Sequence, residues 1–331
     1  MAIKVTDEEF RQAWLACNGR AIEVAKQLGF NGPRGVYDRR NRVEAKHGWR
    51  LPSAGEGFGH HRGDAGVAPY DYRPRLNIEG HTGSVVVFSD AHWWPGISRT
   101  LAYRALVEVV KEVKPGVIIG NGDLLDGARI SRFGASDWQR QPRMVEELEE
   151  VKDCCSEIRH ANRKSRLIRT IGNHCQRFDK YLANHAGDFD GIGGFRLKDH
   201  LSEWEETWSV WVNGNTVIKH RWHGGVHAAW NNVMKSGMSM VTGHTHTLLC
   251  RPFMDYRGRR YGIECGTLAN PGGPQFAYAE DNPGQGCSGF VVLTFDKSGR
   301  LLAPELAEVV DDACYFRGQV VVSDRKKAKA A

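Results

Sequence analysis

Four short apolar stretches of the chain each end in side chains that can bind a metal ion. A β-rich apolar run of this length is typical of a buried strand, and ligands gather outside the carboxyl ends of the strands in an open α/β sheet. The four stretches are Val85–His92, Val117–Asp123, Leu167–His174 and Met240–His246. Since they supply carboxylate, imidazole and amide groups without a thiolate, they suit a hydrolytic centre with two borderline or hard cations.

Asp123, which follows the run Val117–Gly122, is the candidate for a ligand shared by both metal ions. A carboxylate can bridge two cations at the separation of roughly 3.5–4 Å found in two-metal sites. Neutral imidazoles and an amide oxygen then complete the coordination shells without excess negative charge. We therefore expect two divalent metal ions, with manganese favoured and zinc or iron as alternatives.

The elements around these stretches indicate an α/β fold. Amphipathic helices are predicted over Thr100–Val113 and Pro142–Ala161, between the first three strands. This alternation is typical of right-handed βαβ units with parallel strands. Beyond Trp204 hairpin patterns take over, and the last of them pairs Phe290–Phe295 with Leu301–Leu306.

The first fifty residues form a separate basic segment, with ten basic against six acidic side chains in a chain of net charge +6. Thr6-Asp7-Glu8-Glu9 is a capping box that predicts a helix over 7–17, and further helices are predicted over 21–28 and 34–47. The segment resembles a helix-turn-helix DNA-binding module. The residues expected to contact DNA are Arg34, Arg39, Arg40, Arg42 and Lys46. The alternative is a small helical bundle whose charges form a solvated face.

The chain therefore divides into a helix-turn-helix segment (1–50), a Gly/Pro-rich linker (51–83), a catalytic domain (84–318) and a basic tail (319–331). His60 and His61 lie in the linker, where adjacent histidines are expected to be exposed rather than to bind metal. No apolar run approaches the ~20 residues of a membrane helix, and the N-terminus lacks the apolar region of a signal peptide. The eight cysteines show no C-x-x-C pair. These features predict a cytoplasmic protein with reduced thiols and no membrane partner.

Taken in order, five sequence motifs resemble those of the calcineurin-like metallophosphoesterases, and the bacteriophage and prophage members most closely. They are Asp90-Ala91-His92, Gly122-Asp123, Gly172-Asn173-His174, a histidine near position 220, and Gly243-His244-Thr245-His246. The resemblance implies a two-sheet sandwich flanked by helices. It assigns Asp90, His92, Asp123 and His246 to one metal, and Asp123, Asn173, the fourth-motif histidine and His244 to the other. It also implies that a metal-bridging hydroxide attacks phosphorus while His174 assists the leaving group.

Three histidines, His220, His223 and His227, compete for the fourth motif. A strand of ordinary length from the Asn213-Gly214 turn ends at His220, which favours that residue. His223 is followed by Gly224, as in many relatives, and remains the alternative.

The sequence departs from the family pattern in two places. Cys175 stands where the superfamily usually has the carboxylate that orients the catalytic histidine, and a thiol orients weakly. The Asp-Arg-Gly of protein Ser/Thr phosphatases is missing, since Gly127 follows Asp126. Candidate phosphate clamps are Arg177, Arg129 and Arg132, each with a surface salt bridge as the alternative.

These observations favour a phosphodiesterase or nuclease that acts on DNA recruited by the N-terminal segment. One alternative is a phosphomonoesterase or cyclic-nucleotide phosphodiesterase. The other is a DNA-binding regulator with a catalytically weak metal domain, which only Cys175 supports.

Overall fold

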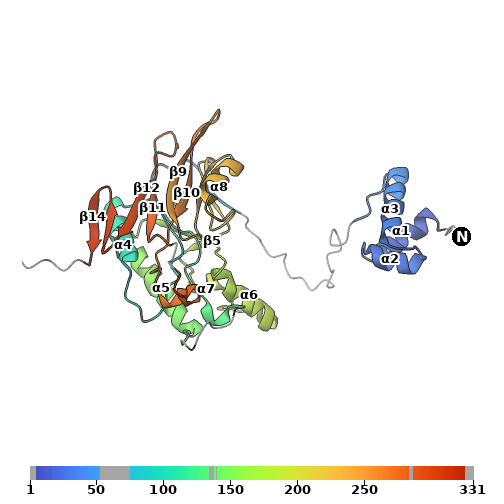
Figure 1. Cartoon of the computed structure of the whole chain (residues 1–331), viewed down its shortest axis with the longest axis horizontal. Coiled ribbons are helices and arrows are strands. Elements are labelled where there is room, and N and C mark those ends of the chain that lie inside the picture. Colours follow the sequence, from blue (N-terminus) through green and yellow to red (C-terminus); the bar gives the residue numbers. More distant parts are fainter. Residues whose placement is uncertain (1–4, 53–74, 134–137, 139, 283–285, 325–331) are drawn as a thin grey trace, which may run out of the picture. The chain divides into compact units, whose positions relative to one another are not determined.

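The computed structural model of the 331-residue chain describes residues 5–52, 75–133, 138, 140–282 and 286–324 (Figure 1). The chain divides into two compact units, Met1–Asp71 and Tyr72–Ala331, each with a hydrophobic core of its own. None of the helices in the described ranges has the length and apolar character that a membrane crossing requires.

Three helices make up the described part of the N-terminal unit: α1 (Asp7–Ala16), α2 (Ala21–Leu28) and α3 (Pro33–His47). They differ by at most one residue at either end from the predicted ranges. Thr6 and Glu9 form the predicted capping box of α1, and Gly29 ends α2 with a left-handed φ of 75°. The helices pack on a shared core of Phe10, Trp14, Val24, Val36 and Val43.

The second unit contains two β-sheets. The eight-stranded sheet has the order β14 (Gln319–Ser323), β13 (Ala313–Phe316), β12 (Glu305–Val310), β11 (Gly289–Phe295), β2 (Gly83–Phe88), β3 (Val117–Gly120), β4 (Arg166–Thr170) and β5 (Glu205–Thr207). The six-stranded sheet has the order β1 (Leu76–Ile78), β6 (Val210–Val212), β7 (Thr216–Ile218), β8 (Ser239–Thr242), β10 (Gly258–Cys265) and β9 (Leu248–Asp255). Strands β2 to β5 are parallel neighbours, as the βαβ pattern predicts.

Alternating side chains place the eight-stranded sheet between two hydrophobic layers. On β2, Val85 and Val87 belong to the core shared with Val241 of the other sheet, whereas Val86 and Phe88 face the helical core. This period of two is a property of any strand. The four-residue apolar run of β2 is therefore buried on both faces, and the two sheets form a sandwich.

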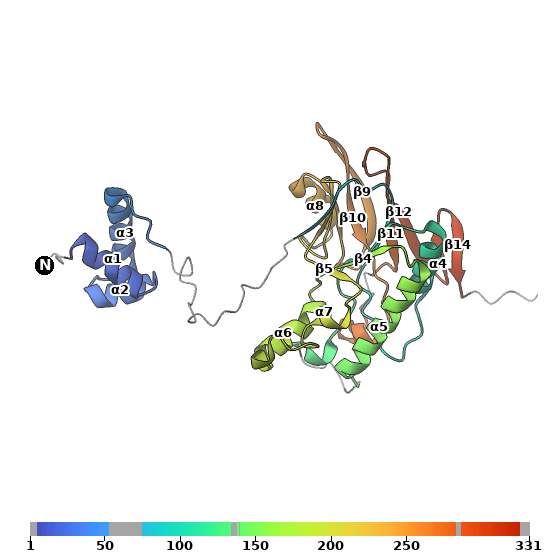
Figure 2. The same ribbon diagram turned by 180° about the vertical axis from the view of Figure 1, so that it is seen from behind.

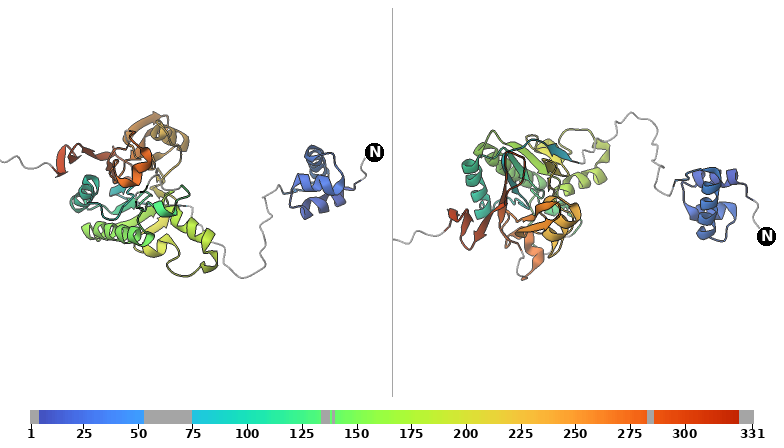
Figure 3. Two further views of the ribbon diagram at one scale, coloured as in Figure 1. Left: turned by 60° about the horizontal axis from the view of Figure 1, so that its bottom comes forward. Right: turned by 90° about the horizontal axis from the view of Figure 1, so that it is seen from above.

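Helices cover the outer faces of the sandwich. They are α4 (Leu101–Val113), α5 (Met144–Ala161), α6 (Cys175–His185), α7 (Leu197–His200) and α8 (Ala228–Ser236), with short 3-10 turns η1 (Ala128–Ile130), η2 (Gly187–Phe189) and η3 (Pro274–Ala279). Helices α4 and α5 lie side by side on the eight-stranded sheet (Figures 2 and 3). Helix α8 covers β8 and β10 of the other sheet, and it approaches so closely that a Cβ at Gly262 would meet the Ala229 carbonyl oxygen at 2.0 Å.

The predicted α/β architecture, two sheets flanked by helices with a small all-α N-terminal part, is confirmed, but three boundaries were wrong. The predicted linker 51–83 contains β1 at its end, where a three-residue strand with one buried side chain is too short to give a periodic signal. The predicted tail 319–331 begins with β14, which pairs with β13 after the Arg317-Gly318 turn. The last hairpin joins β11 to β12, which starts at Glu305; Leu301 makes only an isolated bridge. Residues 53–74, with His60 and His61, and residues 325–331 lie outside the described ranges.

Candidate functional site

The candidate metal ligands lie just beyond the carboxyl ends of five strands. Asp90 follows β2, Asp123 follows β3 and Asn173 follows β4, three parallel neighbours in one sheet. His220 follows β7 and His244 follows β8, which are parallel neighbours in the other sheet. Hence residues far apart in sequence meet at one edge of the sandwich.

A first group of possible ligands consists of Asp90, His92 and His246. Nε2 of His246 lies 3.3 Å from Oδ1 of Asp90, and Nε2 of His92 lies 3.9 Å from the same oxygen. Within the described part of the chain, Oδ1 of Asp90 and Nε2 of His92 are buried without a hydrogen-bond partner. A buried carboxylate oxygen without a donor is costly, and this pair of atoms fits a bound cation.

A second group consists of Asp123, His220 and His244, and Asn173 adjoins it. Nε2 of His220 lies 3.0 Å from Oδ2 of Asp123 and 3.2 Å from Oδ1 of Asn173. The other ring nitrogen of His220 donates to the Asn121 carbonyl at 2.8 Å, which leaves Nε2 to face the group. The donor set of carboxylate, imidazole and amide oxygen again suits a divalent cation.

The fourth-motif alternatives separate clearly in space. His220 is 1% exposed and lies inside the second group. His223 instead donates its backbone N–H to Oδ1 of Asn232 at 3.0 Å, and His227 is exposed just before α8. Of the three histidines, only His220 belongs to a cluster that could hold a metal ion in the described ranges.

Five of the proposed ligands have left-handed backbone conformations. The φ angles are 52° at Asp90, 40° at His92, 50° at Asp123, 72° at His244 and 60° at His246. Such conformations cost side-chain-bearing residues of the order of 1–3 kcal/mol each, and they concentrate at functional sites. The fold therefore holds these side chains in positions that an unconstrained chain would avoid.

Two glycines of the motifs leave space for the ligands. A Cβ at Gly172 would lie 2.1 Å from Oδ1 of Asp123. A Cβ at Gly243 would lie 2.0 Å from Oγ of Ser89, the hydroxyl that donates to Asp90. The motifs thus need glycine at both positions because a ligand or its support occupies the space of the missing side chain.

The electrostatics of the site favour added positive charge. Burial opposes protonation of His92, but the carboxylates of Asp126 and Asp90 outweigh it and raise its pKa to about 10. Burial likewise opposes protonation of His220, and Asp123 and Asp90 raise its pKa to about 9. The raised pKa values show that the site has an excess of negative charge, which attracts protons to the two buried imidazoles. The same negative charge would attract a divalent cation, which takes the place of these protons when it binds.

His174 lies beside the two groups and is oriented by a carboxylate that the sequence did not reveal. Its Nδ1 donates to Oδ1 of Asp126 at 3.0 Å, and its backbone N–H donates to Oδ1 of Asp123 at 2.7 Å. Arg177 donates through Nη1 to the Asp126 carbonyl at 2.9 Å and through Nη2 to Nε2 of His174 at 3.2 Å. Arg177, predicted as a phosphate clamp, is therefore next to His174, where a phosphoryl group would bind.

Cys175 is not the orienting residue. Its side chain is buried, and burial raises the pKa of its thiol to about 11. The carboxylate expected at that position is supplied by Asp126, three residues after Asp123. The sequence does carry a signal for this role, since Asp126 closes a Gly-Asp-x-x-Asp run that begins at Gly122.

Glu264 is a second support that sequence reasoning missed. It is buried at the end of β10 and accepts a hydrogen bond from the hydroxyl of Thr245, which lies between His244 and His246. Its other oxygen accepts from the backbone N–H of Ala229 at 3.3 Å. One carboxylate thus ties the loop that carries two proposed ligands to the start of α8.

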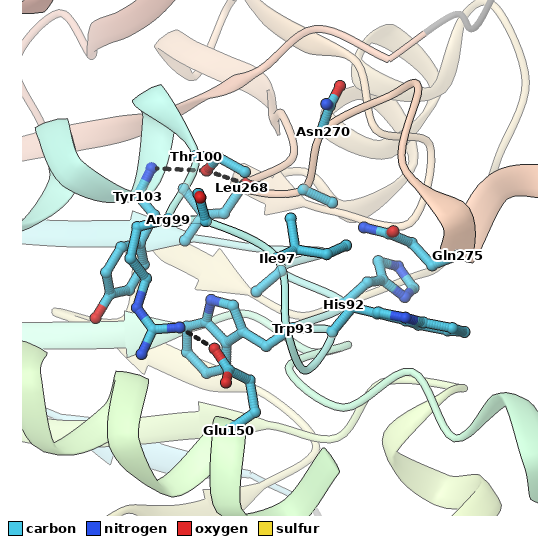
Figure 4. Close-up of a pocket in the computed structure, with 14 residues that line it drawn as sticks. His92, Trp93, Ile97, Arg99, Thr100, Tyr103, Glu150, Leu268, Asn270 and Gln275 are labelled. Carbon is cyan, nitrogen blue, oxygen red and sulfur yellow. Dashed lines mark hydrogen bonds and ion pairs between the residues drawn. The ribbon is translucent and has the colours of Figure 1, made fainter. Parts of the chain in front are cut away.

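The segment around η3 borders the first group of ligands. The Phe276 ring lies 5.5 Å from the ring of His92 and 5.2 Å from that of His246. The neighbouring Gln275 lines, together with His92, a pocket of about 30 Å³ (Figure 4). Nε1 of Trp93 and Oε1 of Gln275 are buried there without a partner among the described residues. This space suits about one ordered water molecule.

The N-terminal cations divide into two sets. Arg39 donates to the Val5 carbonyl at 2.9 Å and to Asp7 at 2.5 Å, and Lys46 also pairs with Asp7. Arg40 bonds Glu44 and the Leu51 carbonyl and lies over the Trp14 ring. Arg34 and Arg42 are exposed and have no ion pair within the described unit. Of the five residues expected to contact DNA, Arg39, Arg40 and Lys46 are therefore engaged within the unit, and Arg39 and Arg40 hold its helices together.

Comparison with known proteins gives distant likenesses. No protein-family model matches the chain. The Gene 54 protein of Mycobacterium phage L5 is 25% identical over 244 residues, covering 66% of this chain and 91% of that protein. Among solved structures, a Vps29 single mutant from Entamoeba histolytica has a TM-score of 0.35 at 16% identity, covering 72% of this chain and 95% of that one.

Two further solved structures are similar at the same low level. NAD nucleotidase (NadN) from Haemophilus influenzae has a TM-score of 0.33 and 12% identity, covering 71% of this chain and 54% of that one. The nuclease MPE from Pseudomonas putida has a TM-score of 0.28 and 15% identity, covering 66% of this chain and 86% of that one.

Proposed function

We propose that the chain is a two-metal phosphoesterase of the calcineurin-like type that hydrolyses phosphodiester bonds in DNA. The observation that carries the proposal is the convergence of two ligand groups, Asp90/His92/His246 and Asp123/His220/His244, with His174 beside them. Each of the five motifs supplies at least one of these residues. Divalent cations bound by the two groups would supply Lewis-acid activation of the phosphoryl group and of water.

The residues of the chain divide the remaining work. Asp126 holds Nδ1 of His174. Once Arg177 leaves Nε2 to bind the phosphate, a protonated Nε2 would be the atom from which a proton passes to the leaving oxygen. Arg177 lies beside that atom and would pair with a non-bridging phosphoryl oxygen. Its guanidinium also offers stabilisation of the charge that develops in the transition state.

The N-terminal unit is proposed to recruit DNA through the exposed face of α3. Arg34, Tyr37, Asn41 and Arg42 recur at helical spacing and are all exposed, whereas Val36 and Val43 face the core. Arginine and asparagine are the side chains that most often read base edges in the major groove. These residues are therefore proposed as the contacts in place of Arg39, Arg40 and Lys46, which bond within the unit.

Turnover of small phosphate esters tests the catalytic proposal. The protein is stripped of metal, reloaded separately with manganese, zinc or iron, and assayed on bis-p-nitrophenyl phosphate and on p-nitrophenyl phosphate. We expect the diester to be hydrolysed with the higher kcat/KM, and manganese to support the reaction. A preference for the monoester would instead identify a phosphomonoesterase, and absence of turnover with every metal would refute the enzyme proposal.

No observation favours the alternative of a regulator with a weak metal domain. That alternative depended on Cys175, and Asp126 occupies the orienting position instead.

A further inference from the structure

The loops that carry the proposed metal ligands also carry arginines and exposed aromatic rings. The loop after β3 continues from Asp126 to Arg129, Arg132 and Phe133, and the loop after β7 continues from His220 to Arg221 and Trp222. Because both loops leave the strands at the end where the ligands lie, these side chains belong to the rim of the site. Phe133 is 65% exposed and Trp222 is 45% exposed.

The η3 segment adds a third aromatic side chain to the rim. Phe276 packs on the two imidazoles of the first group and contacts Tyr278, at 6.3 Å between ring centres. Tyr278 is 65% exposed. Through Phe276, which packs on His92 and His246, the phenol ring of Tyr278 lies next to the first group of ligands.

The arginines of the rim are available to an anion. Arg129, Arg132 and Arg221 are exposed and make no ion pair with any described residue. This sets them apart from Arg99, which pairs with Glu150. Arg132 also lies over the Phe133 ring at 4.7 Å. Glu280 and Asp281 follow Tyr278, so the attraction for a polyanion comes from the other two loops and not from η3.

Arginines that alternate with exposed aromatic rings are better suited to bind single-stranded than duplex nucleic acid. In a duplex the faces of the bases are stacked on one another and cannot reach a protein side chain. In a single strand every base can stack on an aromatic ring while arginines contact the neighbouring phosphates. The rim offers both kinds of contact around the place where a phosphodiester would be cleaved.

We infer that the catalytic unit binds single-stranded DNA, with bases stacked on Trp222 and Tyr278 and flanking phosphates held by Arg129, Arg132 and Arg221. The inference rests on the proposed phosphodiesterase function and names its substrate. Duplex DNA held by the N-terminal unit would then be cut at adjoining unpaired segments.

The test compares kcat/KM for a short single-stranded oligonucleotide and for the same sequence as a duplex. The full chain is used, both as wild type and with Arg34→Ala and Arg42→Ala, so that recruitment by the N-terminal unit does not decide the result. We expect the single strand to be preferred by at least about tenfold in both proteins. An equal or greater rate on the duplex would overturn the inference.

Aromatic variants provide the second measurement. Trp222→Ala and Tyr278→Ala should each raise KM for the oligonucleotide about tenfold more than they raise KM for bis-p-nitrophenyl phosphate. Tyr256→Ala is the matched control, because Tyr256 is fully exposed at the turn between β9 and β10, outside the loops that carry ligands. If the two rim variants behave like Tyr256→Ala, the rim does not bind bases. Loss of diester turnover in the wild type would instead count against the proposed function.

Discussion

Oδ1 of Asp126 accepts hydrogen bonds from Nδ1 of His174 at 3.0 Å and from Nδ1 of His92 at 2.9 Å. A single carboxylate therefore fixes the ring of the proposed general acid and the ring of a proposed metal ligand. Partners of this kind set the tautomer of a histidine and its direction.

Replacing Asp126 by asparagine should lower kcat for bis-p-nitrophenyl phosphate by about 10–100-fold, because the two imidazoles lose the charge that orients them. Cys175→Ala is the matched control, since Cys175 is buried beside the site without bonding His174. Its rate should stay near that of wild type. A loss of rate in Cys175→Ala as large as that in Asp126→Asn would return the orienting role to the cysteine.

His174→Ala should retain its metals and lose rate by about 10²–10⁴-fold, the usual contribution of general acid–base catalysis. The loss should be greatest on a dinucleotide, whose alkoxide leaving group needs a proton, and smaller on a nitrophenyl ester. Metal content and kcat on both substrates are measured together. Wild-type turnover of the dinucleotide would rule out the acid role.

Asp123→Asn should lower occupancy at both metal positions, because one carboxylate is proposed to serve both ions. Asp90→Asn is the comparison, since Asp90 belongs to the first group alone. Elemental analysis of the purified proteins should give two metals per chain for wild type, with the larger deficit in Asp123→Asn. Full occupancy in Asp123→Asn would contradict its assignment as the bridge.

The double variant Arg34→Ala/Arg42→Ala should weaken duplex DNA binding, and the slope of log K against log salt should flatten by about 0.9 for each phosphate that the protein no longer neutralises. Arg39→Ala should mainly lower the melting temperature of the protein, because Arg39 joins α3 to Val5 and Asp7. Fluorescence anisotropy over a salt series and thermal unfolding separate the two effects. An unchanged salt slope in the double variant would leave the N-terminal unit without its proposed role.

Glu147 on α5 is fully buried and accepts a hydrogen bond from the backbone N–H of Gly127 at 2.7 Å. Burial raises the pKa of its carboxyl group from 4.5 to about 7. The folded state therefore binds the proton more tightly than the unfolded state. The proton on Glu147 therefore stabilises the folded state. This stabilisation is fully present below pH 4.5 and is lost as the pH rises through about 7.

Glu147→Gln should remove this dependence. Between about pH 5 and pH 8 the free energy of unfolding of the variant should fall by roughly 2–3 kcal/mol less than that of wild type. Urea unfolding at several pH values measures the difference. Parallel curves for the two proteins would show that Glu147 does not titrate in this range.

The sequence pattern indicates which candidate ligands come together when each of them directly follows a strand. Asp90, Asp123 and His244 each come after an apolar run that ends in the same kind of turn, so local pattern and sheet topology suffice to bring them together. The Gly-Asp-x-x-Asp run marks Asp126 but does not show what it bonds, because the two histidines that it orients lie 34 and 48 residues away in sequence. The same limit applies to Arg39, whose partner Asp7 is on another helix.

Five proposed ligands have left-handed φ angles that lower the stability of the folded protein while they position side chains for function. They are Asp90, His92, Asp123, His244 and His246. Glycine adopts such angles without steric cost, whereas alanine does not. Replacing His92 or His246 by glycine should therefore remove a proposed ligand. The glycine variant should nevertheless unfold at a higher temperature than the variant with alanine at the same position. Selection for thermal stability alone would then draw these positions toward glycine, and only the demand for activity would keep side chains there.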